Sequence, residues 1–251
     1  GSLSAIDGLA VGFDPAANNE TYTQEEWVTY SKPLGDLFTL DGGLKVNTSA
    51  YSGDAVDGNR IYVRADGAEY RYFTAELVYT YNSEDRNGWA GFMFGYTNYE
   101  RQARWGDSPY GVEMFVQKEG KGTYASAKLN DSGFTETNAY EGYTILGEHK
   151  LVLTVSETGA TMTVDGKKSS GITKDFMTKQ YEIPTASVGF FLTNGDFTVK
   201  SFSVTDNGGQ SGDVYDPEKD PDNPIHYTYR NVYDFTGVTD VSSVKDFSAG
   251  I

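Results

Sequence analysis

The stretch from Tyr96 to Tyr110, which joins two apolar segments, is rich in aromatic and polar residues. It holds tyrosines, a tryptophan, two arginines, an asparagine and two acids. Flat aromatic rings stack on the C–H faces of sugars, while arginine, amide and carboxylate groups hydrogen-bond sugar hydroxyls. This mixture has the chemistry to hold a carbohydrate, with Trp105 and Tyr99 as the stacking platforms. The polar contacts expected around them are Arg101, Arg104, Asn98 and Asp107, with Tyr110 at the end of the stretch. In the alternative interpretation, Trp105 caps an edge of the fold and the charges pair with one another.

The chain offers little for nucleophilic catalysis or transition-metal binding. It has no cysteine and two histidines, His149 and His226, neither of which has a second histidine at ligand spacing. A zinc site or a Ser-His-Asp triad therefore lacks its components. Calcium needs only oxygen ligands, which the acidic stretch Asp216–Asn223 contains, although a solvated linker is the competing interpretation. The metal ligands, if any, are unknown.

The charge balance excludes two classes of partner. The 36 acidic residues against 20 basic ones give a net charge of −16, and the longest basic cluster is Lys167-Lys168. Nucleic acids and anionic membrane surfaces attract clustered lysine and arginine, so neither is expected as a partner. We also find no apolar run of about 18 residues that could insert into a bilayer.

The elements that would position these side chains are strands. Alternating apolar residues in Lys150–Val155 and Ala160–Val164 predict a β-hairpin, and Asp165-Gly166 predicts a second tight turn. The other predicted strands are Thr74–Tyr81, Trp89–Tyr96, Gly111–Lys118, Gly122–Asn130, Ala186–Thr193 and Phe197–Thr205. So many strands favour an all-β fold of two antiparallel sheets packed face to face, a β-sandwich. Trp89 lies in an apolar strand and is interpreted as a core residue.

The composition changes near residue 206. Residues 3–205 form the predicted sandwich, and residues 206–226 form an acidic linker rich in glycine and proline with few apolar groups. Residues 227–251 are again aromatic and β-branched. We interpret them as the first strand of a following domain; the alternative is that they return to pair with the sandwich.

Three segments resemble the concanavalin A-like lectin/glucanase superfamily of jelly-roll sandwiches, which includes laminin G-like domains. They are Asn87–Tyr99, the hairpin Glu148–Lys167, and the pair of strands Ser187–Phe191 and Phe197–Val204. The resemblance covers roughly residues 10 to 205. It implies carbohydrate binding on the concave sheet or its rim loops, as in modules appended to bacterial glycoside hydrolases, and a structural calcium ion, which superfamily members often hold.

The same superfamily contains glucanases, which carry a Glu-x-Asp-x-Glu or similar pattern because a retaining mechanism needs two carboxyls about 5 Å apart. That pattern is absent. Glu113 is followed by Met114 and Phe115, and the next acid is Glu119. Glu113 is therefore expected to contact a ligand rather than to catalyse a reaction.

These observations together predict a non-catalytic carbohydrate-binding module of a secreted or cell-surface multi-domain bacterial protein, with any signal peptide outside this sequence. Its expected partners are a glycan and the neighbouring domains of the same polypeptide. One alternative is a glucanase-type glycoside hydrolase that pairs Glu113 with Asp107 or Glu100. The other is a protein-binding adhesin or spacer domain.

Overall fold

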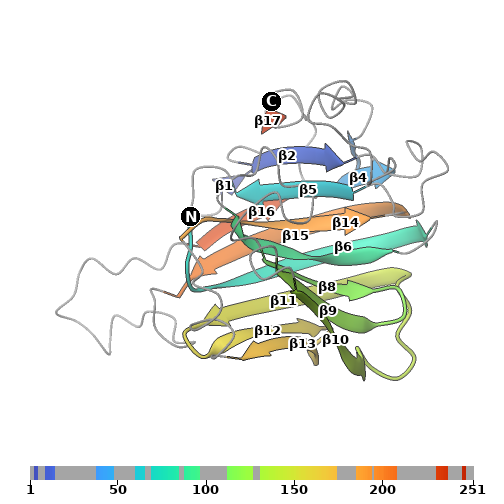
Figure 1. The fold of residues 1–251 in the computed structure, drawn as a ribbon. Coiled ribbons are helices and arrows are strands. Elements are labelled where there is room, and N and C mark those ends of the chain that lie inside the picture. Colours follow the sequence, from blue (N-terminus) through green and yellow to red (C-terminus); the bar gives the residue numbers. More distant parts are fainter. Residues whose placement is uncertain are drawn as a thin grey trace, which may run out of the picture.

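A computed structural model places twelve parts of the chain. They are residues 3–4, 9–14, 38–47, 60–65, 69–84, 88–96, 112–126, 131–173, 185–193, 195–207, 230–236 and 245–246. The regular elements in these ranges are all strands, and they form two sheets (Figure 1). No helix in the described ranges is long and apolar enough to cross a membrane.

Sheet A has nine strands within the described ranges. In spatial order they are β1 (Leu3–Ser4), β16 (Arg230–Asp234), β15 (Gly195–Asp206), β6 (Phe73–Glu84), β11 (Gly147–Ser156), β12 (Gly159–Val164) and β13 (Lys167–Thr173). Two further strands, β3 (Phe38–Leu40) and β4 (Leu44–Asn47), form a hairpin, of which β4 also pairs with β15. The long strands β6 and β15 form the middle of this sheet (Figure 1).

In the part of the chain that the structure describes, sheet B has eight strands. In spatial order they are β10 (Asp131–Asn138), β9 (Lys121–Ser126), β8 (Val112–Gln117), β7 (Trp89–Tyr96), β14 (Ser187–Thr193), β5 (Arg60–Ala65), β2 (Leu9–Asp14) and β17 (Lys245–Asp246). The pairings in both sheets are antiparallel except β1 with β16 and β2 with β17. The predicted all-β, two-sheet antiparallel sandwich is confirmed.

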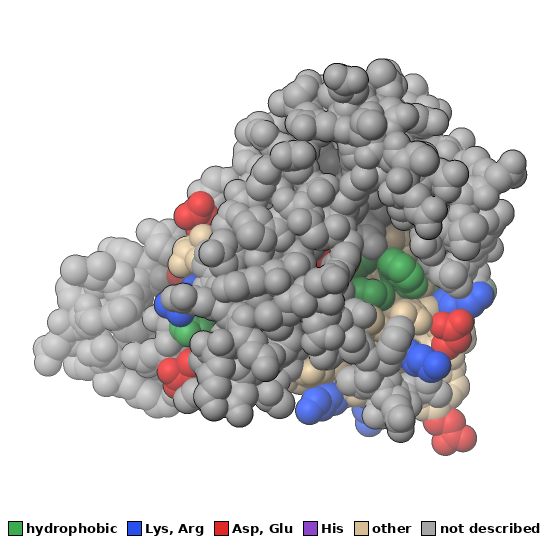
Figure 2. All heavy atoms as spheres, in the orientation of Figure 1, with side chains coloured by type: hydrophobic (Ala, Val, Ile, Leu, Met, Phe, Trp, Pro, Cys, Tyr) green, Lys and Arg blue, Asp and Glu red, His purple; other side chains and the backbone are tan. Residues whose placement is uncertain are grey.

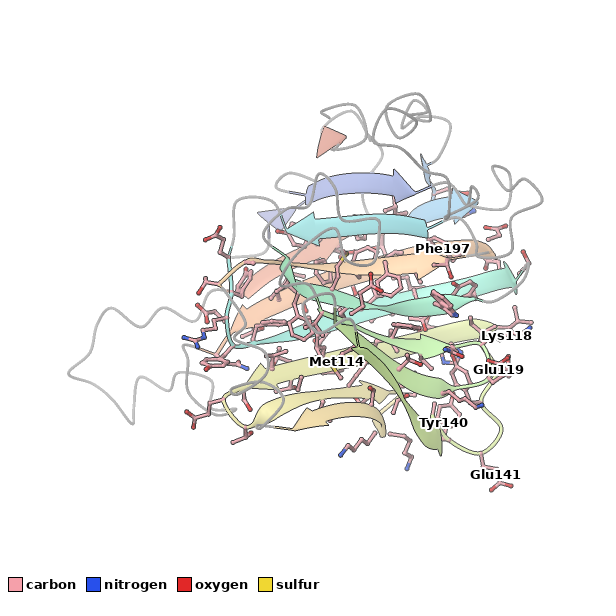
Figure 3. The ribbon with its side chains drawn as sticks, viewed as in Figure 1. Met114, Lys118, Glu119, Tyr140, Glu141 and Phe197 are labelled. Atoms are coloured by element: carbon pink, nitrogen blue, oxygen red, sulfur yellow. The ribbon has the colours of Figure 1, made fainter. Side chains whose placement is uncertain are left out.

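Alternate residues of both sheets fill the space between them. In β11, Leu151, Leu153 and Val155 are fully buried there, as the alternation predicted. Figure 3 shows Met114 of sheet B and Phe197 of sheet A, both part of this core. Burying the aromatic side chains of these strands supplies the main driving force for folding.

The predicted hairpin is confirmed in detail. Strands β11 and β12 pair from Leu151↔Val164 to Ser156↔Gly159, which leaves a two-residue turn between them. The second turn contains Asp165 at φ 50° and Gly166 at φ 81°. Aspartate and glycine tolerate this left-handed region, so their order in the sequence suits a tight hairpin turn.

Residues 230–236 differ from the expectation that residues 227–251 begin a following domain. Strand β16 pairs with β15 from Ser201↔Asp234 to Thr205↔Arg230, and Tyr233 and Phe235 are buried in the core. The ring of Tyr233 stacks on that of Phe202, with centroids 5.8 Å apart. The physical reason is that β16 pairs with the backbone at the edge of β15 and covers an apolar surface of the core with its rings. These residues therefore belong to the sandwich, whereas most of residues 206–226 lie outside the described ranges.

The two sheets come very close together at one end, near β9 and β13. A Cβ atom on Gly122 would overlap the backbone carbonyl and the hydroxyl of Ser169. Only glycine fits such an approach between two backbones, so Gly122 determines how tightly this end of the sandwich closes.

Candidate functional site

Seven of the predicted ligand contacts lie outside the described residues. They are Asn98, Tyr99, Arg101, Arg104, Trp105, Asp107 and Tyr110. They belong to residues 97–111, which follow β7 and precede β8 in the sequence; these two strands are adjacent and antiparallel, with Phe94 opposite Val112. The role of these residues in sugar binding therefore stays a prediction.

Glu113 is the one predicted contact that the structure describes. It lies in β8 opposite Met93 of β7 and Ala125 of β9, and it is 6 % exposed. Its neighbours Val112 and Met114 belong to the core between the sheets. Because successive side chains of a strand alternate, Glu113 lies on the opposite face, which we call the outer face of sheet B.

An aromatic row crosses this outer face over three adjacent strands. The rings of Trp89 and Phe115 have centroids 5.0 Å apart, and those of Phe115 and Phe191 are 5.6 Å apart in an edge-on arrangement. Phe115 and Phe191 both lie directly opposite Gly91, one from each neighbouring strand. A Cβ atom on Gly91 would overlap Phe115, so this glycine leaves the space over which the two rings meet.

Trp89 is the accessible end of the row. Phe191 and Met93 are fully buried and Phe115 is 5 % exposed, whereas Trp89 is half-buried. The expectation that Trp89 is a core residue is wrong, because its strand neighbour Ala90 points into the core and Trp89 points away from it. Its strand is apolar on both faces, which is why alternation alone did not reveal the direction of the ring.

Polar side chains accompany Trp89 at this end. Gln117 lies directly opposite Trp89 and donates from Nε2 to Thr123 Oγ1 at 3.3 Å. Thr193 Oγ1 accepts a hydrogen bond from the Trp89 backbone N–H at 2.9 Å. A half-buried indole beside amide and hydroxyl groups has the mixed character expected of a small sugar-binding surface.

Among the described side chains of the outer face there is one carboxylate, whereas a retaining glycosidase needs two. On β8, Glu113 shares this face with Phe115 and Gln117, since the three residues are spaced by two. Among the side chains that the structure describes on this face, Glu113 is the only acid. A partner about 5 Å away, as hydrolysis with retention requires, is therefore absent from the described part of the site.

A second polar cluster joins the turn after β12 to the start of β11. His149 Nδ1 lies 2.7 Å from Asp165 Oδ2, and Tyr140 donates its hydroxyl hydrogen to the same oxygen at 2.7 Å. The backbone N–H of Lys150 donates to Asp165 Oδ1 at 2.8 Å. His149 Nε2 faces the Leu146 carbonyl oxygen at 3.2 Å. Because both ring nitrogens of His149 are occupied, this cluster holds structure together rather than offering a base or a metal ligand.

The electrostatics of the cluster follow from these contacts. Burial alone would raise the pKa of the Asp165 carboxyl, but the hydrogen bonds from Lys150, His149 and Tyr140 outweigh it and hold that pKa below its ordinary value. The hydrogen bond to Asp165 in turn raises the pKa of Tyr140 to about 12. Tyr79, packed against His149 with ring centroids 6.1 Å apart, has its pKa raised by burial.

Charged groups elsewhere are paired or mixed. Lys150 lies 3.1 Å from Glu76 on the side of sheet A turned to solvent, and Lys200 pairs with Glu148 on the same side. Figure 2 shows the described acidic and basic side chains near one another rather than in a patch of one sign. Among the described residues no group of three potential metal ligands converges. The acidic stretch Asp216–Asn223 lies outside them, so calcium binding stays a prediction.

No protein-family model matches the chain, and no curated protein matches it in sequence.

Several solved structures share part of the arrangement. A carbohydrate-binding module, CBM66 from Bacillus subtilis, has a TM-score of 0.45 and 12 % identity over 79 % of this chain and 96 % of that chain. A structure described for endo-acting O-glycanases of the human gut microbiota has a TM-score of 0.48 and 12 % identity over 73 % and 78 %. SCLam, a non-specific endo-β-1,3(4)-glucanase of family GH16, has a TM-score of 0.44 and 13 % identity over 76 % and 74 %.

These scores are too low to carry an argument about function. The class that the molecule's own architecture defines is a two-sheet antiparallel β-sandwich. One sandwich architecture supports many activities, so the function of the outer face depends on the side chains of Trp89 and its neighbours.

Proposed function

We propose that this protein is a non-catalytic carbohydrate-binding module and that the outer face of sheet B contributes to its glycan site. The observation that carries the proposal is the aromatic row Trp89–Phe115–Phe191, of which Trp89 remains accessible beside Gln117. Binding modules hold sugars by stacking and hydrogen bonding without a reacting pair of carboxyls.

Each side chain has a distinct part in this proposal. The indole of Trp89 stacks on the C–H face of a sugar ring, and Phe115 behind it fixes the indole by a ring contact at 5.0 Å. Gln117, opposite Trp89, has an amide that can donate to and accept from sugar hydroxyls. The loop between β7 and β8, with Trp105 and Tyr99, would add further contacts at the other end of the same two strands.

The hydrolase alternative makes a different demand on Glu113. That residue would need a second carboxylate, such as Asp107 or Glu100, within about 5 to 9.5 Å. The described outer face favours binding over hydrolysis because Phe115 and Gln117 stand where the next two acids of the Glu-x-Asp-x-Glu pattern would lie.

The wider setting belongs to the same proposal. A secreted or cell-surface multi-domain protein would present this module to a glycan, and the acidic, proline-containing stretch at 206–226 has the composition of a spacer. The adhesin or spacer alternative predicts protein binding in place of glycan binding.

The experiment is a glycan-array screen with and without calcium, followed by calorimetric titration of the best ligand. Trp89→Ala should lower affinity at least tenfold, as expected when a stacking contact worth about 1.4 kcal/mol is lost. The variant should stay folded, with a lower melting temperature because its ring contact with Phe115 is lost. Trp105→Ala tests the loop in the same way. Leu146→Ala is the control, since it removes an exposed apolar side chain, 46 % exposed, from outside this face.

Two results would overturn the proposal. Release of reducing sugar that depends on Glu113, measured with Glu113→Gln, would establish a hydrolase. Failure of every glycan to bind, or binding that Trp89→Ala and Trp105→Ala leave intact, would remove this site.

A further inference from the structure

Tyr81 spans the space between the two sheets. It belongs to β6 of sheet A, is 1 % exposed, and places its hydroxyl oxygen 2.5 Å from the Thr193 carbonyl oxygen and 3.0 Å from the Trp89 carbonyl oxygen. Both acceptors lie in sheet B. The single hydroxyl hydrogen of Tyr81 therefore serves two backbone carbonyls, one of them that of the accessible tryptophan.

The hydroxyl lies where two strands of sheet B separate. The pairing of β7 with β14 ends at Leu192↔Ala90, so the next residues, Thr193 and Trp89, are not partners in that ladder. They are connected by side chains instead, through the bond from the Trp89 N–H to Thr193 Oγ1 at 2.9 Å and through Tyr81. The backbone of Trp89 is thus held at both its N–H and its carbonyl group.

Gly195 makes room for the Tyr81 ring. A Cβ atom on Gly195 would lie 2.8 Å from Tyr81 Cε1 and 2.5 Å from the Ser83 carbonyl oxygen. The ring also contacts Phe197, with centroids 5.6 Å apart. Such a confined ring has little freedom, so its hydroxyl reaches a fixed point in sheet B.

From this geometry we propose that Tyr81 is the positioning residue of Trp89. By holding the Trp89 carbonyl, it sets the backbone from which the indole projects, and so sets the angle at which the indole meets a sugar. The part that concerns glycan affinity rests on the proposed function; the part that concerns the position of Trp89 does not.

The test compares two tyrosines on the same face of β6. Tyr81→Phe removes the hydroxyl that bonds to sheet B, whereas Tyr79→Phe removes a fully buried hydroxyl that has no hydrogen-bond partner among the described residues. The chain has three tryptophans, so the indole N–H signals of ¹⁵N-labelled protein are few, and Trp89→Phe assigns that of Trp89. Tyr81→Phe should move the Trp89 signal and weaken glycan binding about fivefold. Tyr79→Phe should do neither.

Every outcome decides a separate point. An unmoved Trp89 signal and wild-type affinity in folded Tyr81→Phe would refute the positioning role. If the wild-type protein binds no glycan, the proposed function fails, but the shift of the Trp89 indole signal still tests the positioning role of Tyr81. Should Tyr81→Phe not fold, Thr193→Val removes the other side-chain bond to the Trp89 backbone and must move the same signal.

Discussion

Replacing Asp165 by asparagine tests the polar cluster most directly. The carboxylate accepts three hydrogen bonds, from His149, Tyr140 and the Lys150 backbone. Asparagine keeps the size of the side chain and tolerates φ 50°, so the change removes charge without adding backbone strain. Alanine would add strain of about 1–2 kcal/mol and is the less informative variant.

The magnitude follows from the three bonds. A hydrogen bond to a charged group contributes about 1.5–3 kcal/mol against about 1 for a neutral one. Three such differences, reduced because the Asp165 side chain is 29 % exposed, predict a loss of about 2 kcal/mol. Asp41→Asn is the control, because Asp41 is 74 % exposed in its pair with Lys45 and should change stability by less than about 0.5 kcal/mol.

The assay is urea unfolding at several pH values. The pKa of Asp165 is lowered in the folded protein, so its stabilisation is complete above the unfolded-state pKa of about 4 and is lost as the pH falls through the folded-state pKa. The difference in free energy of unfolding between wild type and Asp165→Asn should therefore be largest at pH 7 and should shrink below about pH 4. Equal urea midpoints of the two proteins at pH 7, or the same difference at pH 7 and below pH 4, would refute the reasoning.

Three further expectations can be measured by urea unfolding at pH 7. Gly122→Ala should lower the free energy of unfolding by about 3 kcal/mol or more, because the new methyl group overlaps Ser169. The control Gly171→Ala, on the facing strand, meets the flexible end of Lys168 and should lower it by less than about 1 kcal/mol. Equal losses would contradict the close approach of the sheets. Tyr79→Phe should leave stability unchanged or raise it by up to about 1 kcal/mol, since the lost hydroxyl is buried and has no hydrogen-bond partner among the described residues. A clear loss of stability would show that the hydroxyl is hydrogen-bonded. Glu76→Gln, which breaks the exposed pair with Lys150, should change stability by less than about 1 kcal/mol; a larger loss would contradict an exposed pair.

Local patterns predicted the hairpin of β11 and β12 and the strands β6–β9, β14 and β15, because those features depend on neighbouring residues. Leu151, Leu153 and Val155 are spaced by two residues, and Lys150 and Thr154 lie on the other face, so the period of two predicted their common face. The direction of Trp89 was not, since Trp89–Phe94 is apolar on both faces. The aromatic row depends on Gly91 being opposite Phe115 in one strand and Phe191 in another, which is long-range information that no local pattern contains.

The Asp165–His149 contact likewise depends on long-range pairing that local sequence patterns do not contain. The sequence predicted Asp165 to be a turn residue, and His149 directly precedes the predicted strand Lys150–Val155. Their contact can be predicted only from the pairing of Leu151 with Val164, because that register places the turn beside the beginning of β11. The pairing of β16 with β15 was kept only as an alternative, since composition does not say which strand edge a distant segment will join.

The pairing of β16 with β15 bears on how this protein can be shortened. A fragment that stopped at residue 206, where the composition changes, would lack Tyr233 and Phe235 and would uncover core surface that these rings bury. It would also leave the backbone of Ser201–Thr205 without its neighbour on that side, and an unpaired strand edge beside an apolar surface invites chains to associate edge to edge. Deletion work should therefore treat β16 as part of the folding unit, because the boundary suggested by composition cuts through a sheet.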